Sequence, residues 1–220
     1  MKKTFLFLLL ATTSAPAVFA QTGSTKAYTR GSSDSRNTGF GVKGGYNLNG
    51  LRGDDIGGLD RKARNDFHAG FFGQFGLNNF SSIQTELLYS RQGFEANTGV
   101  TGSKQKYRMD YLQLPVMYVG NVTNNISFHV GPQVSLLTNI KREDKSLSIK
   151  ENGFNSFDYG GVAGLEARVG PARIGARYNL SLGKIFEAGP STTGLVASQF
   201  GNSRIYNNLL QVYVGFGFNQ

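Results

Sequence analysis

Residues 210–218 read Leu-Gln-Val-Tyr-Val-Gly-Phe-Gly-Phe. The even-numbered positions from Leu210 to Phe218 carry Leu, Val or Phe, whereas the odd-numbered positions between them carry Gln, Tyr or Gly. Because successive side chains of a β-strand point to opposite faces, this alternation predicts a strand with one apolar face. The same kind of alternation recurs over residues 40–48, 67–77, 83–92, 111–118, 126–136, 157–169 and 173–180. The sequence therefore predicts eight strands.

The connections between these strands alternate in length. Short turns are expected near residues 79, 123 and 170, and long polar segments lie at 49–65, 95–107, 141–155 and 183–203. Short turns on one side and long loops on the other are typical of outer-membrane barrels. We therefore predict an all-β fold: a closed antiparallel eight-stranded transmembrane β-barrel, an up-and-down meander, over residues 39–218. An even number of strands would place both ends of the barrel on the periplasmic side.

The N-terminal region has the pattern of an export signal. Lys2 and Lys3 precede a short apolar run, and Val18-Phe19-Ala20 offers a small-residue cleavage site, so we predict a signal peptide over residues 1–20. Residues 21–38 are rich in Ser, Thr, Gly and Arg without periodicity, which predicts a flexible periplasmic tail. The apolar run is too short for a transmembrane helix, so an outer-membrane location is expected for the barrel.

Composition excludes several kinds of site and partner. The 220 residues include no Cys, so neither a disulfide nor a thiolate metal site can form. The formal net charge is +9, but the basic residues are scattered and follow an export signal, which argues against a nucleic-acid partner. We expect these residues to meet outer-membrane lipids and anionic lipopolysaccharide instead. Two isolated His side chains make a poor metal site, so no metal or other cofactor is expected.

A soluble lipocalin-like barrel is the structural alternative, because it also has eight strands. Alternation alone does not decide whether the apolar face points inward or outward. A lipid-facing apolar surface is favoured because that face recurs on all eight predicted strands, with Tyr at several strand ends as in an interfacial aromatic belt. The opposite face is rich in Gly and polar residues, which suits a crowded lumen.

The face opposite the apolar one carries charged residues that would be enclosed in the lumen. An eight-stranded barrel leaves an interior just wide enough for side chains to fill. We therefore predict a plugging network, with ion pairs between residues 173 and 177 on one strand and the acidic residues on the preceding strand. A narrow ion path is the alternative. The predicted network consists of Lys43, Glu86, Asp158, Glu166, Arg168, Arg173 and Arg177.

One possible catalytic cluster lies at the predicted outer rim. Pairing of two strands across the Asn78-Asn79 turn would place His68 next to Ser90, with Asp66 on the same face. A nucleophile, a base and an orienting carboxylate are what a lipid hydrolase requires. No oxyanion donor can be identified, and Ser, His and Asp are ordinary at a solvated rim, so we predict that the protein is not an enzyme. At Pro115, which lacks a backbone donor, we expect a β-bulge.

Four motifs in order resemble a known family. They are GVKGGYNL at residues 41–48, YLQLPV at 111–116, FDYG at 157–160 and GARYNL at 175–180. Together they are similar to the porin-family outer-membrane β-barrel domain, which includes PorT-like proteins, over residues 39–218. The resemblance implies an eight-stranded outer-membrane barrel. The family is functionally heterogeneous, so no catalytic residues are carried over.

These observations favour one function and leave two alternatives. The favoured one is a structural or interaction role in a Gram-negative cell envelope, with a plugged lumen and with loops or the N-terminal tail contacting envelope proteins. The first alternative is a narrow porin-like transporter of small solutes or ions. The second is an outer-leaflet lipid hydrolase.

Overall fold

The computed structural model describes residues 37–53, 59–60, 64–97, 104–142, 145–149, 154–186 and 204–218. The predicted signal peptide and residues 21–36 of the predicted tail lie outside this part of the chain. Within the described ranges there is no helix long and apolar enough to cross a membrane.

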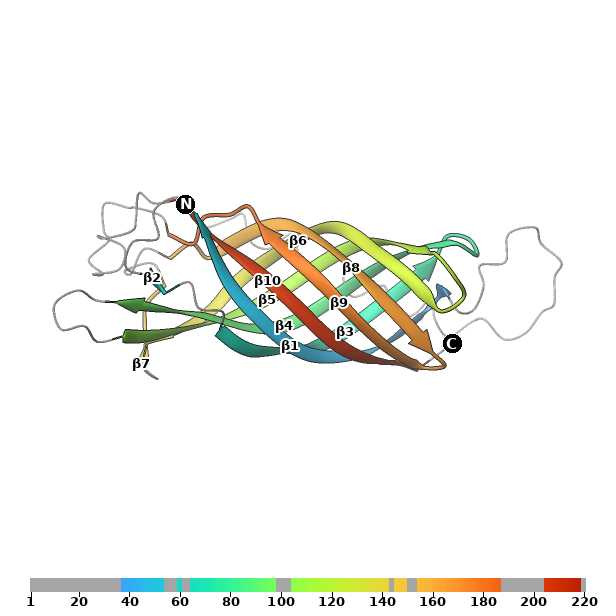
Figure 1. The fold of residues 1–220 in the computed structure, drawn as a ribbon, viewed down its shortest axis with the longest axis horizontal. Helices are drawn as coiled ribbons and strands as arrows, with labels where there is room; N and C mark the ends of the chain where they lie inside the picture. The colour runs from blue at the N-terminus through green and yellow to red at the C-terminus, as the bar shows by residue number, and fades with distance from the viewer. Residues whose placement is uncertain are drawn as a thin grey trace, which may run out of the picture. The chain divides into compact units, whose positions relative to one another are not determined.

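Eight of the described strands form a closed barrel (Figure 1). Each pairs antiparallel with the next barrel strand in the sequence, and the first closes against the last. The predicted eight-stranded meander is therefore confirmed. The barrel strands are β1 (Gly39–Gly53), β3 (Arg64–Gly76), β4 (Ser81–Asn97), β5 (Lys104–Asn121), β6 (Ile126–Arg142), β8 (Phe157–Val169), β9 (Ala172–Ser181) and β10 (Ile205–Gly217). Two short strands, β2 (Leu59–Asp60) and β7 (Lys145–Ser146), pair with β4 and β6.

The apolar face of the barrel strands points outward. Val214 and Leu165 are 63% and 61% exposed, whereas the inward-facing Glu86 and Arg173 are 2% and 1% exposed. A soluble barrel would bury the first pair and expose the second. The lipocalin-like alternative is therefore wrong, because a continuous exposed apolar surface around a charged interior suits hydrocarbon and not water.

Short turns join the strands at one end of the barrel, here called the turn end. The Asn78 side chain accepts hydrogen bonds from the backbone N–H groups of Phe80 and Ser81, both at 2.8 Å, which closes the β3–β4 turn. Gly170 has a φ of 58° in the β8–β9 turn, a conformation that glycine adopts without steric cost. The turns predicted near residues 79, 123 and 170 are thus confirmed.

At the opposite end, here called the loop end, the strands are longer than predicted. Strand β4 runs to Asn97 and β5 starts at Lys104, with Glu95 opposite Lys106. In this part of the hairpin the inward residue Phe94 is apolar and fully buried, while Glu95 and Lys106 are charged. The polarity of the two faces is therefore reversed relative to the lipid-facing part, which made the segment look like a polar loop.

Pro115 does not lie at a bulge. Its register against β6 is continuous, with Pro115 opposite Gln133 and Tyr118 opposite Val130. The single register shift between these strands lies between Asp110 and Tyr111. The predicted bulge at Pro115 is therefore wrong. Pro115 has no backbone N–H to donate, and the pairing of β5 with β4 is interrupted there, but the register is the same on both sides of the gap.

Candidate functional site: the barrel interior

Three kinds of inward side chain succeed one another along β4. From the turn end toward the loop end, they pass from Glu86 through Gln92 to Phe94, all buried. On the neighbouring β5, Gln113 is likewise followed by buried Tyr111 and Tyr107, whereas its part nearer the turn end contributes apolar Met117 and Val119. The interior therefore contains a charged layer, a polar cavity and an apolar plug.

Two carboxylates organise the charged layer. Glu86 of β4 receives the ammonium of Lys43 from β1 at 2.6 Å and the guanidinium of Arg177 from β9 at 2.5 Å. The amide of Gln84 donates to the same Glu86 oxygen as Lys43, at 2.7 Å. Because β1 and β9 do not pair with β4, these contacts cross the lumen.

Glu166 of β8 is the second carboxylate. Its Oε1 accepts from Arg173 at 3.3 Å and from Arg168 at 3.4 Å, and its Oε2 accepts from the Tyr213 hydroxyl at 3.0 Å. Arg173 also donates to Gln74 at 2.8 Å. Both glutamates are therefore held by several charge-assisted hydrogen bonds, the condition under which buried ions are tolerated.

Two aromatic rings complete the environment of the cations. The Lys43 ammonium lies 3.8 Å from the centre of the Tyr213 ring, and the Arg173 guanidinium lies 4.3 Å from that of Phe72. Cation–π contacts of this kind strengthen when the groups are removed from water.

Six of the seven predicted network residues lie together in the structure, and the seventh, Asp158, lies apart from them. Asp158 bonds to Ser181 and to the backbone of Gly183, away from the charged layer. Arg177 pairs with Glu86 across the lumen and not with the acidic residues of β8. The six residues Lys43, Glu86, Glu166, Arg168, Arg173 and Arg177 are called the central charged layer below.

Sequence reasoning missed the role of Tyr213, although a signal was present. Its register partner on β1 is Gly45 and its partner on β9 is Gly175. A Cβ atom at Gly175 would lie 2.4 Å from the Tyr213 ring. An inward aromatic residue with glycine on both neighbouring strands is a pattern that marks a ring lying flat across the barrel wall.

The possible catalytic cluster is placed inside the lumen. His68 lies opposite Ser90 in the strand register, but both are buried, at 1% and 0% exposure. The His68 Nδ1 is 2.7 Å from the Asn47 side-chain oxygen, and the Asn47 amide donates to Ser90 at 3.0 Å. Asn47 therefore stands between imidazole and hydroxyl. The Asp66 carboxylate accepts from Asn49 at 3.2 Å.

An apolar cluster fills the interior at the loop end. Phe94 stacks on Tyr107 with ring centres 5.0 Å apart, and Phe154 packs on Phe186 at 5.0 Å. These side chains are themselves buried, at 5% exposure or less. The cluster, called the apolar plug, consists of Phe94, Tyr107, Met109, Tyr111, Leu137, Ile140, Phe154, Ile185, Phe186 and Ile205.

An asparagine cluster lies at the turn end. The Asn37 amide donates to the backbone oxygens of Asn78 and Asn79 at 2.9 and 3.0 Å, and its oxygen accepts from Asn121 at 2.8 Å. Asn37, two residues before β1, is thus fixed to two hairpin turns and is buried. Within the described residues, no group of three or more His, Asp or Glu side chains could hold a metal ion.

Comparison with known proteins identifies the family. A sequence profile described as "outer membrane protein beta-barrel domain" matches residues 19–187. No curated protein sequence matches the chain. The PorT-like group named above is not confirmed by these comparisons and stays a prediction.

Solved structures of bacterial outer-membrane barrels are similar to this chain. Neisserial surface protein A has a TM-score of 0.50 and 13% identity, covering 81% of this chain and 97% of that one. The attachment invasion locus protein Ail of Yersinia pestis has a TM-score of 0.48 and 14% identity, covering 83% and 99%. At 13% identity, the similarity to Neisserial surface protein A shows a shared fold and nothing more. With the family profile matching most of its length, the chain belongs to the outer membrane protein beta-barrel domain family and is an outer-membrane β-barrel.

Proposed function

We propose that this protein is a non-conducting barrel with a structural or interaction role in the cell envelope, acting through its two ends and its outer surface. The observation that carries the proposal is the pair of contacts by which Lys43 and Arg177 reach Glu86 across the lumen. Eight strands leave room for side chains but not for an aqueous channel, and here the side chains meet in the middle.

The apolar plug supports the same function. Solutes entering from the loop end would first meet stacked rings such as Phe94 and Tyr107, and would then meet buried ion pairs. Passage would require the removal of both obstacles. Opening a path through the charged layer would also break the ion pairs that hold the buried glutamates. Breaking one buried pair costs about 3–5 kcal/mol.

The outer surface is suited to lipids and lipopolysaccharide. Arg91 lies over the outward-facing Phe67 ring, 4.8 Å from its centre, and pairs with Asp110 at 3.2 Å. An Arg just above exposed aromatic residues is placed at the height where lipid headgroups meet the barrel. Envelope proteins are the expected partners of the loops and of the N-terminal tail.

The burial of His68 and Ser90 disfavours the hydrolase alternative. A lipid ester would have to reach a hydroxyl that is 0% exposed and already accepts from Asn47. We therefore propose that the protein has no enzymatic activity.

Single-channel recording in planar bilayers tests the closed lumen. The purified protein should give no discrete conductance steps in bilayers where a known porin does. The transporter alternative predicts steps that change when Arg177 or Glu166 is replaced by a residue of opposite charge. The central charged layer has four cationic groups and two carboxylates, 4 − 2 = +2, so a conducting lumen should favour anions. Anion-selective steps from the unaltered protein would contradict the proposal.

Crosslinking in intact envelopes tests the interaction role. The full-length protein and a variant lacking residues 22–36 would be crosslinked and compared. A partner captured by the first and lost from the second would assign the contact to the tail. Equal capture by both would assign it to the barrel or its loops, and reproducible capture of nothing above background would contradict the interaction role.

A further inference from the structure

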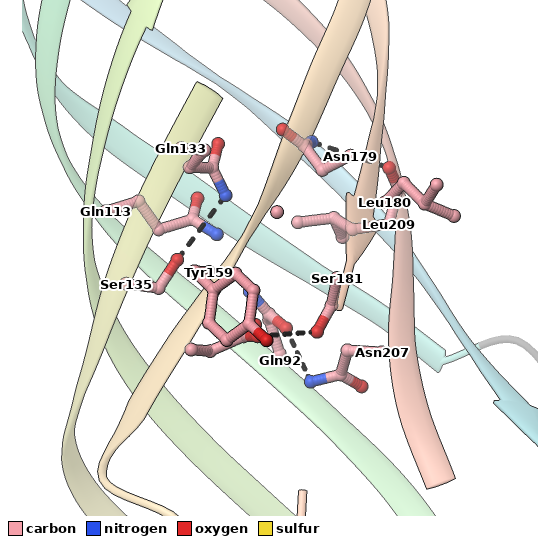
Figure 2. Close-up of a pocket in the computed structure, with 12 residues that line it drawn as sticks. Gln92, Gln113, Gln133, Ser135, Tyr159, Asn179, Leu180, Ser181, Asn207 and Leu209 are labelled. Carbon is pink, nitrogen blue, oxygen red and sulfur yellow. Dashed lines mark hydrogen bonds between the residues drawn. The ribbon is translucent and has the colours of Figure 1, made fainter. Parts of the chain in front are cut away.

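A small polar cavity lies inside the barrel between the central charged layer and the apolar plug (Figure 2). Its volume is about 20 Å³, enough for one water molecule or one small ion. The polar side chains that line it come from six strands and are mostly amides and hydroxyls. They are Gln92, Gln113, Gln133, Ser135, Asp158, Asn179, Ser181 and Asn207.

Three amide oxygens of the lining have no hydrogen-bond partner. They belong to Gln113, Gln133 and Asn179, which are 2%, 8% and 4% exposed. Gln113 makes no side-chain hydrogen bond to any described residue. A buried acceptor without a partner costs about 1–3 kcal/mol, so three in one cavity indicate a missing donor or cation.

The orientation of Asn179 is fixed by its neighbours. Arg177 donates through Nε to the Gln211 side-chain oxygen at 2.7 Å, which identifies that atom as an acceptor. The Asn179 nitrogen donates to the same oxygen at 2.9 Å. The Asn179 oxygen must therefore be its free acceptor, and Figure 2 shows its nitrogen turned toward β10.

Asp158 adds a negative charge without a counter-ion. Its Oδ1 accepts from the Ser181 hydroxyl at 2.6 Å and from the Gly183 N–H at 3.1 Å. Within the described residues Asp158 forms no ion pair, and Arg177, which was expected to pair with the acidic residues of β8, is bound to Glu86 instead. The cavity thus offers one carboxylate, several neutral oxygens and no described cation.

We propose that this cavity binds a monovalent alkali cation, Na⁺ or K⁺. Carboxylate, amide and hydroxyl oxygens are the ligands that hard cations prefer. A single charge balances the one carboxylate, whereas a divalent ion would leave a net positive charge in a poorly solvated interior. A water molecule could donate to two of the acceptors but would leave the Asp158 charge uncompensated. Such an ion could be bound whether or not the lumen conducts, so the site is independent of the proposed function.

Ion-dependent stability tests the site. The full-length protein in phospholipid vesicles would be unfolded with urea in NaCl, in KCl and in N-methyl-D-glucamine chloride, at equal ionic strength. The unfolding midpoint should be higher in at least one alkali salt and should rise with its concentration, since a ligand of the folded state stabilises it by mass action. Asp158→Asn should abolish this dependence, and Asp66→Asn, which removes a carboxylate outside the cavity, should retain it.

A second measurement covers the case in which Asp158→Asn does not fold. Crystals of the unaltered protein grown with Tl⁺, a heavy substitute for K⁺, should show an anomalous peak among Gln113, Asn179 and Asp158. Equal midpoints in all three salts, or a dependence retained by Asp158→Asn, would overturn the proposal. An anomalous map without a peak in the cavity, which would indicate water only, would do so as well.

Discussion

Arg177 donates to Glu86 at 2.5 Å, although the strands that carry them, β9 and β4, are not neighbours in the barrel. Glu86 also receives Lys43 at 2.6 Å through its other oxygen. One carboxylate therefore balances two cations from two further strands. The three side chains therefore contribute unequally to stability. Loss of Glu86 removes the carboxylate that two buried cations share, whereas loss of Arg177 leaves the pair between Lys43 and Glu86 intact.

Glu86→Gln should therefore destabilise the barrel more than Arg177→Met. Removing one partner of a buried ion pair costs about 3–5 kcal/mol. The glutamine variant leaves Arg177 without its charge partner and leaves Lys43 with only the more distant Glu166, at 3.9 Å. The free energy of unfolding would be measured with urea in phospholipid vesicles. Glu95→Gln, near the loop end of β4, should stay within about 0.5 kcal/mol of the unaltered protein. A larger loss for Arg177→Met than for Glu86→Gln would contradict this account of the layer.

Gly175→Ala should destabilise the barrel through Tyr213. The added Cβ would lie 2.4 Å from the Tyr213 ring and 2.8 Å from the backbone oxygen of Leu165, so the ring must move and its 3.0 Å hydrogen bond to Glu166 is weakened. Overpacking of this kind costs about 1–3 kcal/mol. The matched control is Gly44→Ala, where the nearest atom is 3.5 Å away, an ordinary contact. The same urea titration compares them, and equal stability of the two variants would show that the ring has room to shift.

Alternation in the sequence predicted the eight barrel strands and which residues share a face, and the recurrence of the apolar face on all eight strands predicted that this face points outward. The expected pair between Arg173 and Glu166 of the preceding strand is present, at 3.3 Å. The partner of Arg177 could not be predicted, because contacts across the lumen depend on the stagger of the strands. Arg177 lies opposite Gly164 in the β8–β9 register, six residues from Asp158 along β8. The two side chains expected to pair are therefore at different heights, and Glu86 of β4 is at the height of Arg177.

The loop end could not be predicted for a different reason. Beyond the lipid-facing part, the barrel wall is surrounded by water, so Lys106 points outward while Tyr107 and Phe94 fill the interior. The period of two persists, but the apolar face changes side. A prediction based on one continuous apolar face places the end of the strand where the apolar residues change side. For this reason residues 95–107 were expected to form a loop.

A lysine placed on the outer surface should reveal where the hydrocarbon lies. Val212 is 47% exposed and faces outward in the middle of β10, whereas Asn208 faces outward near the loop end. Val212→Lys should cost about 2–4 kcal/mol in vesicles and Asn208→Lys about 0–1 kcal/mol, since the penalty falls from the bilayer midplane to the interface. Unfolding free energies in vesicles check the difference. Equal costs at both positions would contradict a membrane boundary between them.

Phe186→Ala tests whether the apolar plug and the central charged layer are separate obstacles. Phe186 is 1% exposed and packs against Phe154 at 5.0 Å and Phe94 at 6.1 Å, so its truncation should cost about 3–5 kcal/mol. The variant should still give no conductance steps in planar bilayers, because the Arg177–Glu86 contact below it is intact. The double variant Phe186→Ala with Arg177→Ala removes a side chain from both obstacles and is the combination in which steps are expected. Steps from Phe186→Ala alone would mean that the plug is the sole barrier and that the ion pairs serve stability, not closure.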